Sequence, residues 1–239
     1  MDKKNHLILW LCAAALLFSA FVINNDQKVS AVQQKTMKEF FAPIGKFMKD
    51  HKEFLSQSAD SLQLKNTDPE EIIAKVDGWP ITVGELEFRK GIREASGLSS
   101  ETVTYNEVFN DLVEEKVILS FAHKNNVLPT QAQVNEFIEM EKQWYDDNAG
   151  GYKEITDALL KSSGMTLEEY WTTYEWYNAF RLVTDKNCYE LAIQQGKEKG
   201  EITEDLKQAD EYWRSILKGC KKKAKIEIKD DKGLNLPIL

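Results

Sequence analysis

The most continuous apolar stretch of the chain lies near its beginning. Seventeen residues from Leu7 to Ile23 carry no charge, and Lys3 and Lys4 precede them. A run of this length is typical of a secretory signal or a short membrane-spanning helix, which needs about 17–25 residues. We therefore expect residues 1–27 to form an uncleaved signal anchor, with the body outside the cytoplasm because basic residues precede the span. Residues 29–31 are a tolerable cleavage site, so a secreted product is the alternative.

A helical apolar pattern mixed with lysines follows. Between Met37 and Leu55, apolar residues recur at helical spacing, and lysines lie between them. Pro43 should begin or kink this helix. A basic amphipathic helix can lie on a membrane surface or dock on the rest of the protein, and the pattern leaves both open. We call residues 28–68 the stem, and its polar end, residues 56–68, is expected to be a linker.

Beyond the stem, strand patterns flank a series of helical patterns. Residues 72–76 predict a strand, Asp77-Gly78 a hairpin turn, and residues 224–228 a second alternating strand. Capping boxes that open at Thr82, Thr130 and Thr166 mark helix starts. The predicted helices run from Val83 to about Ala95, Tyr105 to about Asn125, Thr130 to the break at Gly150-Gly151, Lys153 to Ser163, Thr166 to about Lys199, and from a cap at Thr203 to just before Gly219.

The two strands decide the predicted fold class. A lone strand leaves its backbone groups unpaired, so we expect the strands at 72–76 and 225–228 to pair. The prediction is a mainly α protein. Residues 69–239 form a multi-helix body that is closed by a small β pairing of its N- and C-terminal strands, and a transmembrane helix precedes it.

Charge divides the chain along the same boundary. The 239 residues carry a net charge of −8. Residues 1–65 hold nine basic and six acidic residues, whereas the remainder holds 22 basic and 33 acidic ones. An acidic body argues against nucleic-acid binding, which needs a basic face. Three histidines and three cysteines leave little material for a metal site, and no cofactor is predicted.

Several segments of the body resemble one known family. Residues 74–82 (AKVDGWPIT), followed by Glu85-Leu86, are similar to the opening strand, turn and helix of the SurA N-terminal domain family, a chaperone module shared by SurA, PrsA and PpiD-type proteins. Residues 112–134 resemble its second and third helices, and residues 212–228 its closing helix and strand. The resemblance covers about residues 70–228 and implies a SurA-N-like chaperone fold.

One part of that family's usual architecture has no counterpart in this sequence. Members commonly carry a parvulin-type prolyl isomerase domain between the long helix and the closing helix. Here residues 196–203 join those helices directly, and a folded domain needs about 50 residues or more. The resemblance therefore implies the chaperone module without its enzyme.

Aromatic residues gather on the predicted long helix. Six of them spread over about 220° of its circumference, which is wider than the stripe of roughly 100° that a surface helix buries. The helix is therefore either sandwiched in the core or presents aromatic side chains in a groove for extended polypeptides. Trp144 and Tyr145, which lie before the break at Gly150-Gly151, could form part of the same surface. The candidate client-binding residues are therefore these two and the six of the long helix: Trp144, Tyr145, Tyr170, Trp171, Tyr174, Trp176, Tyr177 and Phe180.

Other candidate chemistry is sparse. The adjacent acidic pairs Glu114-Glu115, Asp146-Asp147 and Glu168-Glu169 are expected on solvated helix faces, because neighbours in sequence do not face each other on a helix. Cys188 and Cys220 can form a disulfide outside the cytoplasm or remain two buried thiols. The sequence shows no nucleophilic triad, phosphate loop or metal-ligand spacing.

These observations lead to one functional hypothesis and two alternatives. The hypothesis is a membrane-anchored extracytoplasmic chaperone, a holdase that binds non-native secreted polypeptides through an apolar aromatic groove without making or breaking bonds. The first alternative is a non-catalytic adaptor that binds one specific partner at the membrane. The second is a residual peptidyl-prolyl isomerase, which has the family resemblance behind it and no recognisable catalytic residues.

Overall fold

The computed structural model describes residues 31–63, 68, 71–97, 102–229, 233 and 236. The predicted signal anchor, with its apolar run from Leu7 to Ile23, lies outside these residues. None of the helices in the described ranges is long and apolar enough to cross a membrane.

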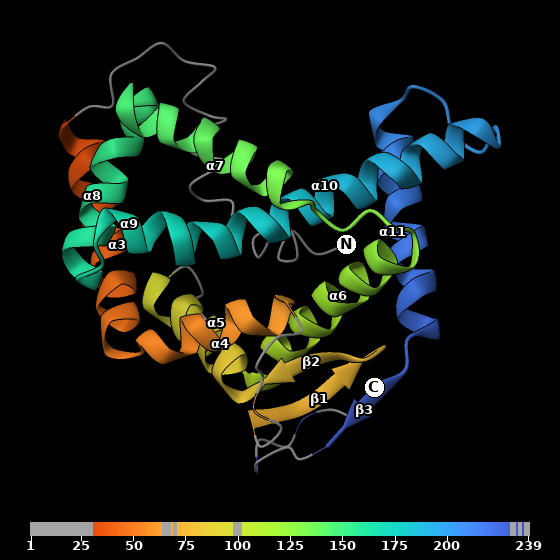
Figure 1. The fold of residues 1–239 in the computed structure, drawn as a ribbon, viewed down its shortest axis with the longest axis horizontal. Helices are drawn as coiled ribbons and strands as arrows, with labels where there is room; N and C mark the ends of the chain where they lie inside the picture. The colour runs from red at the N-terminus through yellow and green to blue at the C-terminus, as the bar shows by residue number, and fades with distance from the viewer. Residues whose placement is uncertain are drawn as a thin grey trace.

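Helices dominate the structure, and a small sheet lies at one edge of it (Figure 1). The helices are α3 (Ala31–Asp50), α4 (Lys52–Gln63), α5 (Val83–Ser96), α6 (Tyr105–Lys124), α7 (Gln131–Asp146), α8 (Tyr152–Ser163), α9 (Leu167–Glu169), α10 (Glu175–Glu198) and α11 (Leu206–Lys223). A 3-10 turn, η2 (Ala149–Gly151), precedes α8, and a π-helical turn, η3 (Tyr170–Tyr174), joins α9 to α10. The strands are β1 (Ile72–Val76), β2 (Trp79–Thr82) and β3 (Ile226–Ile228).

The sheet confirms the predicted pairing of the two ends of the body. Its strand order is β2-β1-β3, and both pairs are antiparallel. Val76 lies opposite Ile226, and Ala74 lies opposite Ile228. The last strand is shorter than predicted because Ala224 caps the end of α11. The mainly helical body with a small closing sheet is therefore as expected.

Local signals placed most helix boundaries correctly. The side chains of Thr82, Thr130 and Thr166 each accept a hydrogen bond from the backbone N–H three residues later, as capping boxes predict. Thr104 caps α6 in the same way, and this cap was not among the predicted ones. Gly200, with a φ of 70°, follows the end of α10 as predicted.

The last helix differs from its prediction at both ends. Asp205, not Thr203, caps α11, because the Asp205 side chain accepts the backbone N–H of Gln208 at 2.9 Å. The hydroxyl of Thr203 instead donates to the Gln208 side chain at 2.8 Å. The helix continues through Gly219 to Lys223, because one glycine costs a helix only about 1 kcal/mol.

The stem docks on the body, and its expected linker is partly helical. Residues 56–63, predicted as linker, belong to α4, and Leu62 near the end of that helix is 1% exposed. Helix α3 packs along α8, and α4 packs on α5. Pro43 lies inside α3. The polar composition of residues 56–63 concealed a buried side, because Ser58 and Ala59 are small enough to pack there.

Two clusters of buried apolar side chains make up the core. The larger one lies between the stem helices, α5, α7, α8 and α10. The smaller one lies between the sheet and α6. Figure 1 shows α7 and α10 running from α8 towards the opposite side, where α11 leads from the far end of α10 back to the sheet. The larger cluster holds the aromatic residues that the sequence singled out.

Candidate functional site

The aromatic residues are arranged around a π-helical turn. Helices α9, η3 and α10 form one continuous rod from the Thr166 cap, as the predicted long helix requires. Within it, the N–H of Glu175 bonds to the carbonyl of Tyr170, five residues back. Tyr170 and Trp171, which are adjacent in sequence, are both buried here. Single π turns inside α-helices are often found at functional sites.

Edge-to-face contacts connect the rings across three elements. The Tyr170 and Trp171 ring centroids are 4.8 Å apart, and Trp171 lies 6.1 Å from Tyr145 of α7. Trp144, also on α7, lies 6.2 Å from Tyr152 of α8. Such pairs contribute about 0.5–1.5 kcal/mol each beyond the area that they bury. They hold α7, α8 and the π turn to one another.

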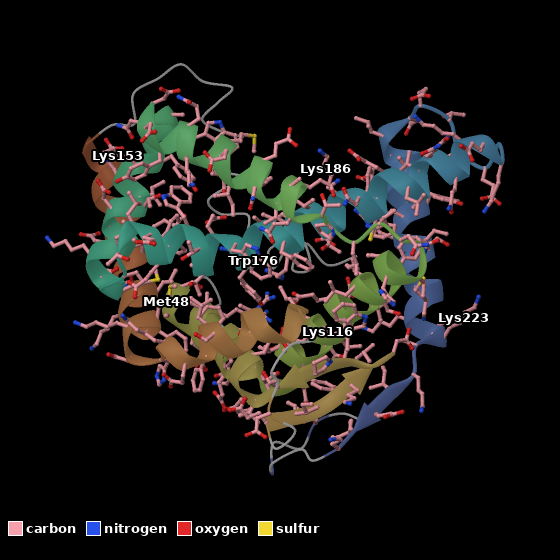
Figure 2. All side chains as sticks on the ribbon, in the orientation of Figure 1. Met48, Lys116, Lys153, Trp176, Lys186 and Lys223 are labelled. Atoms are coloured by element: carbon pink, nitrogen blue, oxygen red, sulfur yellow. The ribbon has the colours of Figure 1, made fainter. Side chains whose placement is uncertain are left out.

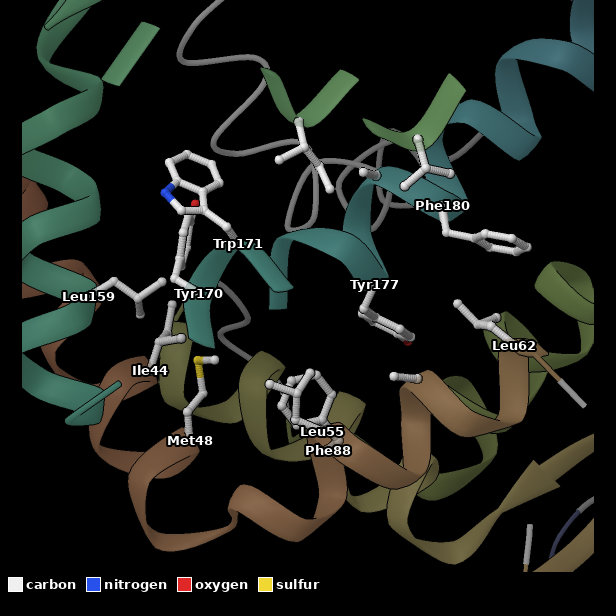
Figure 3. Close-up of a cluster of buried hydrophobic side chains, with 14 of the residues drawn as sticks. Ile44, Met48, Leu55, Leu62, Phe88, Leu159, Tyr170, Trp171, Tyr177 and Phe180 are labelled. Atoms are coloured by element: carbon white, nitrogen blue, oxygen red, sulfur yellow. The ribbon is translucent and has the colours of Figure 1, made fainter. Parts of the chain in front are cut away.

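The stem helices close the other side of this cluster. Figure 3 shows Ile44 and Met48 of α3 below Tyr170, and Leu55 and Phe88 below Tyr177. Leu55 belongs to the stem helix α4, whereas Phe88 belongs to α5, and the Phe88 ring centroid is 6.3 Å from that of Tyr177. The stem therefore covers part of the aromatic surface of the long helix.

Most of the candidate client-binding residues belong to the core in this structure. Tyr145, Tyr170, Trp171, Tyr177 and Phe180 are each at most 9% exposed. The other three, which we call the rim residues, are half-buried and pack against the edge of the same cluster: Trp144, Tyr174 and Trp176 (Figure 2 labels Trp176 on α10). The structure thus brings all eight together. It sandwiches five of them between helices and leaves the rim residues partly accessible.

The buried tyrosines satisfy their hydroxyl groups. The hydroxyl of Tyr145 donates to Asp157 at 2.8 Å, and that of Tyr177 accepts from Arg89 Nε at 2.8 Å. The Tyr152 and Tyr170 hydroxyls are 3.4 Å apart. These contacts fix the rings in the core, because a buried hydroxyl without a partner would be costly.

An ion network that was not predicted from the sequence lies beside Tyr177. Glu115, expected on a solvated face, pairs with Arg89 of α5 and with Arg181 of α10, the latter at 2.6 Å. Burial alone would raise the pKa of Glu115, but the charges of Arg181 and Arg89 outweigh it and lower the pKa to about 2. Lys116 forms a fully buried pair with Glu85 at 2.7 Å. The expectation failed because Glu115 lies three residues after the buried Leu112, on the same side of α6.

Two more acids were also missed, Glu141 of α7 and Glu175 of α10. They are 0% and 2% exposed. Burial raises the pKa of Glu141 well above its usual 4.5, and the nearby Glu175 raises it further. A sequence signal existed, because Glu141 falls on the apolar stripe of Val134, Ile138 and Tyr145.

Cys188 and Cys220 are free thiols in the structure. Cys188 is buried, and its Sγ lies 3.8 Å from the carbonyl oxygen of Ile118. Burial, with smaller contributions from Asp185 and Cys220, raises the pKa of Cys188 to about 12. A thiol with so high a pKa is a poor nucleophile at neutral pH.

The chemistry that this region offers is apolar contact through the rim residues. In the described part of the chain, no three His, Cys, Asp or Glu side chains are grouped so that they could hold a metal ion. The partly accessible aromatic rings offer a surface for apolar side chains.

Comparison with known proteins yields one weak similarity. The foldase protein PrsA of Clostridium perfringens (strain SM101 / Type A) is 26% identical over 114 residues, which cover 41% of this chain and 33% of that protein. The similarity therefore spans only about a third of the length of this relative. No protein-family model matches the chain. No solved structure matches it either.

Proposed function

We propose that this protein is a chaperone that holds non-native secreted polypeptides by reversible apolar contact. The observation that carries the proposal is the aromatic cluster with its accessible rim, in a chain that is similar to a foldase over part of its length. The body is of the SurA-N-like type in this proposal, in line with its mainly helical fold and its closing sheet. Binding of this kind needs no reacting group.

The rim residues are the proposed contact surface for clients. Trp176 stacks on Phe180 with centroids 5.3 Å apart, and Tyr174 lies 5.5 Å from Tyr170. Each rim ring thus rests on a buried ring that fixes its position. A rigid aromatic surface binds apolar chain segments with little loss of its own conformational entropy. The five buried aromatic residues act as the support of this surface.

The proposed place of action is the outer face of a membrane. The support is the apolar run from Leu7 to Ile23 behind Lys3 and Lys4. The stem docks on the body, so a membrane-bound chain would hold the body close to the bilayer. Fractionation of cells tests whether the chain is attached to the membrane, and protease accessibility tests whether the body lies on its outer side. Release of the full chain into the soluble fraction, without cleavage, would contradict the anchor.

The direct test is suppression of aggregation of an unfolded client by the full chain. The double variant Trp144→Ala/Trp176→Ala should weaken client binding about thirtyfold, and suppression with it, because each lost aromatic contact costs about 1 kcal/mol. The matched control is Trp213→Ala. Trp213 is equally half-buried but lies on α11, 5.7 Å from Phe121. It should leave suppression unchanged.

The same experiments separate the alternatives. Equal suppression by the double variant and the wild type would exclude the rim as the client surface. Recovery of a single stoichiometric folded partner, with no suppression of aggregation, would favour the adaptor. Catalysed proline isomerisation that is lost on changing one polar residue would favour the residual isomerase.

A further inference from the structure

Glu141 and Glu175 lie in the core between α7 and α10 as a pair of acids from different helices. Glu141 takes the central position in the buried stripe of α7, and Glu175 is the first residue of α10, directly after the π turn. Their side chains come from helices that pack against each other. The network around Glu115 has two arginines, whereas neither of these acids has a cationic partner among the described contacts.

Two ionised carboxylates could not remain in this position. Both oxygens of Glu141 and Oε2 of Glu175 are buried and have no hydrogen-bond partner in the described structure. An isolated buried charge costs so much that the group takes up a proton instead. One proton between the two carboxyls supplies the missing donor and removes a charge. Acid pairs elsewhere share a proton for the same reason.

The groups that face the pair agree with this arrangement. The Tyr152 hydroxyl of α8 favours the ionised form of Glu141, while Tyr170 of the π turn and Asn178 of α10 favour the ionised form of Glu175. Burial raises the pKa values of Tyr152 and Tyr170 too, so both remain neutral donors. Within residues 102–229, no Lys, Arg or His contributes to the shift of either acid. Burial raises the pKa of Glu175 as well, and the neighbouring Glu141 opposes this rise.

We propose that Glu141 and Glu175 form a proton-dependent latch that holds α7 against α10, and that loss of the shared proton as the pH rises releases α7. The side chains that the latch keeps covered are apolar. Val134 and Ile138 lie on the same face of α7, and Tyr145 contacts Trp171. Release of α7 therefore uncovers the buried aromatic surface between the helices. That this surface then binds more client rests on the proposed chaperone function, whereas the latch itself does not.

The sign of the pH effect follows from proton linkage. A carboxyl whose pKa is raised by folding binds more protons in the folded state than in the unfolded chain. Its contribution to stability is complete below the usual pKa of 4.5 and is lost as the pH rises through the raised value. Each proton released in this way lowers the folding equilibrium constant about tenfold per pH unit.

Other acids contribute with the same sign and must be separated from the pair. Burial raises the pKa of Asp111 to about 6 and that of Asp185 to about 7, although Arg93 and Arg181 respectively oppose the rise. The wild-type pH curve contains these contributions. Only variants of the pair itself isolate the latch.

The test uses the full chain between about pH 5 and about pH 9, the range in which buried carboxyls titrate. Three measurements are followed: binding of an apolar fluorescent dye, quenching of tryptophan fluorescence, and far-ultraviolet circular dichroism. Wild type should bind more dye and show more quenching as the pH rises, with little loss of helix. An infrared difference spectrum should show the carbonyl stretch of protonated carboxyls at neutral pH. The double variant Glu141→Gln/Glu175→Gln should lose the part of that band that the pair contributes, whereas the part from Asp185 remains.

Glu141→Gln keeps a hydrogen-bond donor at this position at every pH, because an amide cannot lose its proton in this range. It should stay closed and lose the dye-binding response. If Glu141→Gln does not fold, Glu175→Gln serves as the second variant, with the same expected result. The matched control is Glu136→Gln, an exposed acid on the same helix, which should respond as wild type does.

Several outcomes would overturn the latch. One is a dye-binding response in both glutamine variants equal to that of wild type; another is the absence of the carboxyl band from wild type. If the helical signal disappears over the same pH range in which dye binding changes, the protein unfolds globally and α7 is not released by itself. Closure at high pH by added Ca²⁺ would mean that a cation, not a proton, joins the pair.

A pH-dependent dye response without any change in client binding would support the latch and contradict its link to the chaperone function.

Discussion

The Asp77 side chain accepts a hydrogen bond from the backbone N–H of Lys225 at 2.8 Å. This contact joins the first hairpin turn to the start of the last strand. The other carboxylate oxygen of Asp77 accepts from Ser120 and from Lys124 of α6, both at 2.6 Å. One side chain thus connects the two ends of the body to the helix beneath the sheet.

Replacing Asp77 should destabilise the closure of the body. Asp77→Ala loses three hydrogen bonds and places alanine at a φ of 49°, so a cost of about 2–4 kcal/mol is expected. Asp77→Asn should cost clearly less, because Asn tolerates this backbone conformation and keeps an acceptor for Lys225. Urea unfolding of both variants measures the difference. Equal losses would mean that the side-chain acceptor does not matter.

The docking of the stem can be tested at one glycine. A Cβ at Gly45 of α3 would collide with the Ser162 side chain of α8. Gly45→Ala should therefore lose about 1–3 kcal/mol through overpacking. The matched control is Gly219→Ala on α11, where a Cβ meets nothing within 4 Å. It should gain about 0.5–1 kcal/mol from helix propensity. Thermal unfolding compares the two, and a neutral Gly45→Ala would argue against close packing of α3 on α8.

Glu115 should contribute to loss of stability in acid. Its pKa is lowered to about 2, because Arg181 and Arg89 outweigh the opposing effect of burial. Its stabilising effect is therefore present above the usual pKa of 4.5 and disappears as the pH falls towards 2. Glu115→Gln should cost about 2–4 kcal/mol at neutral pH and flatten this part of the curve.

The neighbouring acid provides the control for this prediction. Glu114 is exposed, and Lys221 lies 3.9 Å from it. Glu114→Gln should change stability by no more than about 0.5 kcal/mol, as surface pairs do. Denaturant titrations across the acid range distinguish the variants. Equal acid slopes for Glu115→Gln and wild type would show that the network does not act in this way.

The two thiols should differ in reactivity. Cys220 is half-buried and should react with a thiol reagent first, whereas Cys188 should react only when the protein unfolds. Counting thiols in the native and the denatured protein, without reductant, measures this. If a disulfide joins Cys188 and Cys220 outside the cytoplasm, neither of these two thiols will react in the isolated protein even when it is denatured, and an uncleaved chain will show only the thiol of Cys12. Cys220→Ser and Cys188→Ser identify which group has reacted.

The sequence by itself determined the features that depend on neighbouring residues. Thr82, Thr130 and Thr166 cap helices because their partners are three residues away, and the Asp77-Gly78 turn needs no distant contact. The pairing of the terminal strands also followed, because unpaired strands leave their backbone groups unsatisfied.

Only the tertiary structure decided which side chains are covered. The apolar stripe of the stem could have faced a membrane as well as α8, and the aromatic residues of the long helix point in directions that suit both a groove and a sandwich. Glu141 and Glu175 are 34 residues apart in sequence, and their approach depends on how α7 packs on α10. Burial and the pKa changes that follow from it are properties of such packing, which no local pattern records.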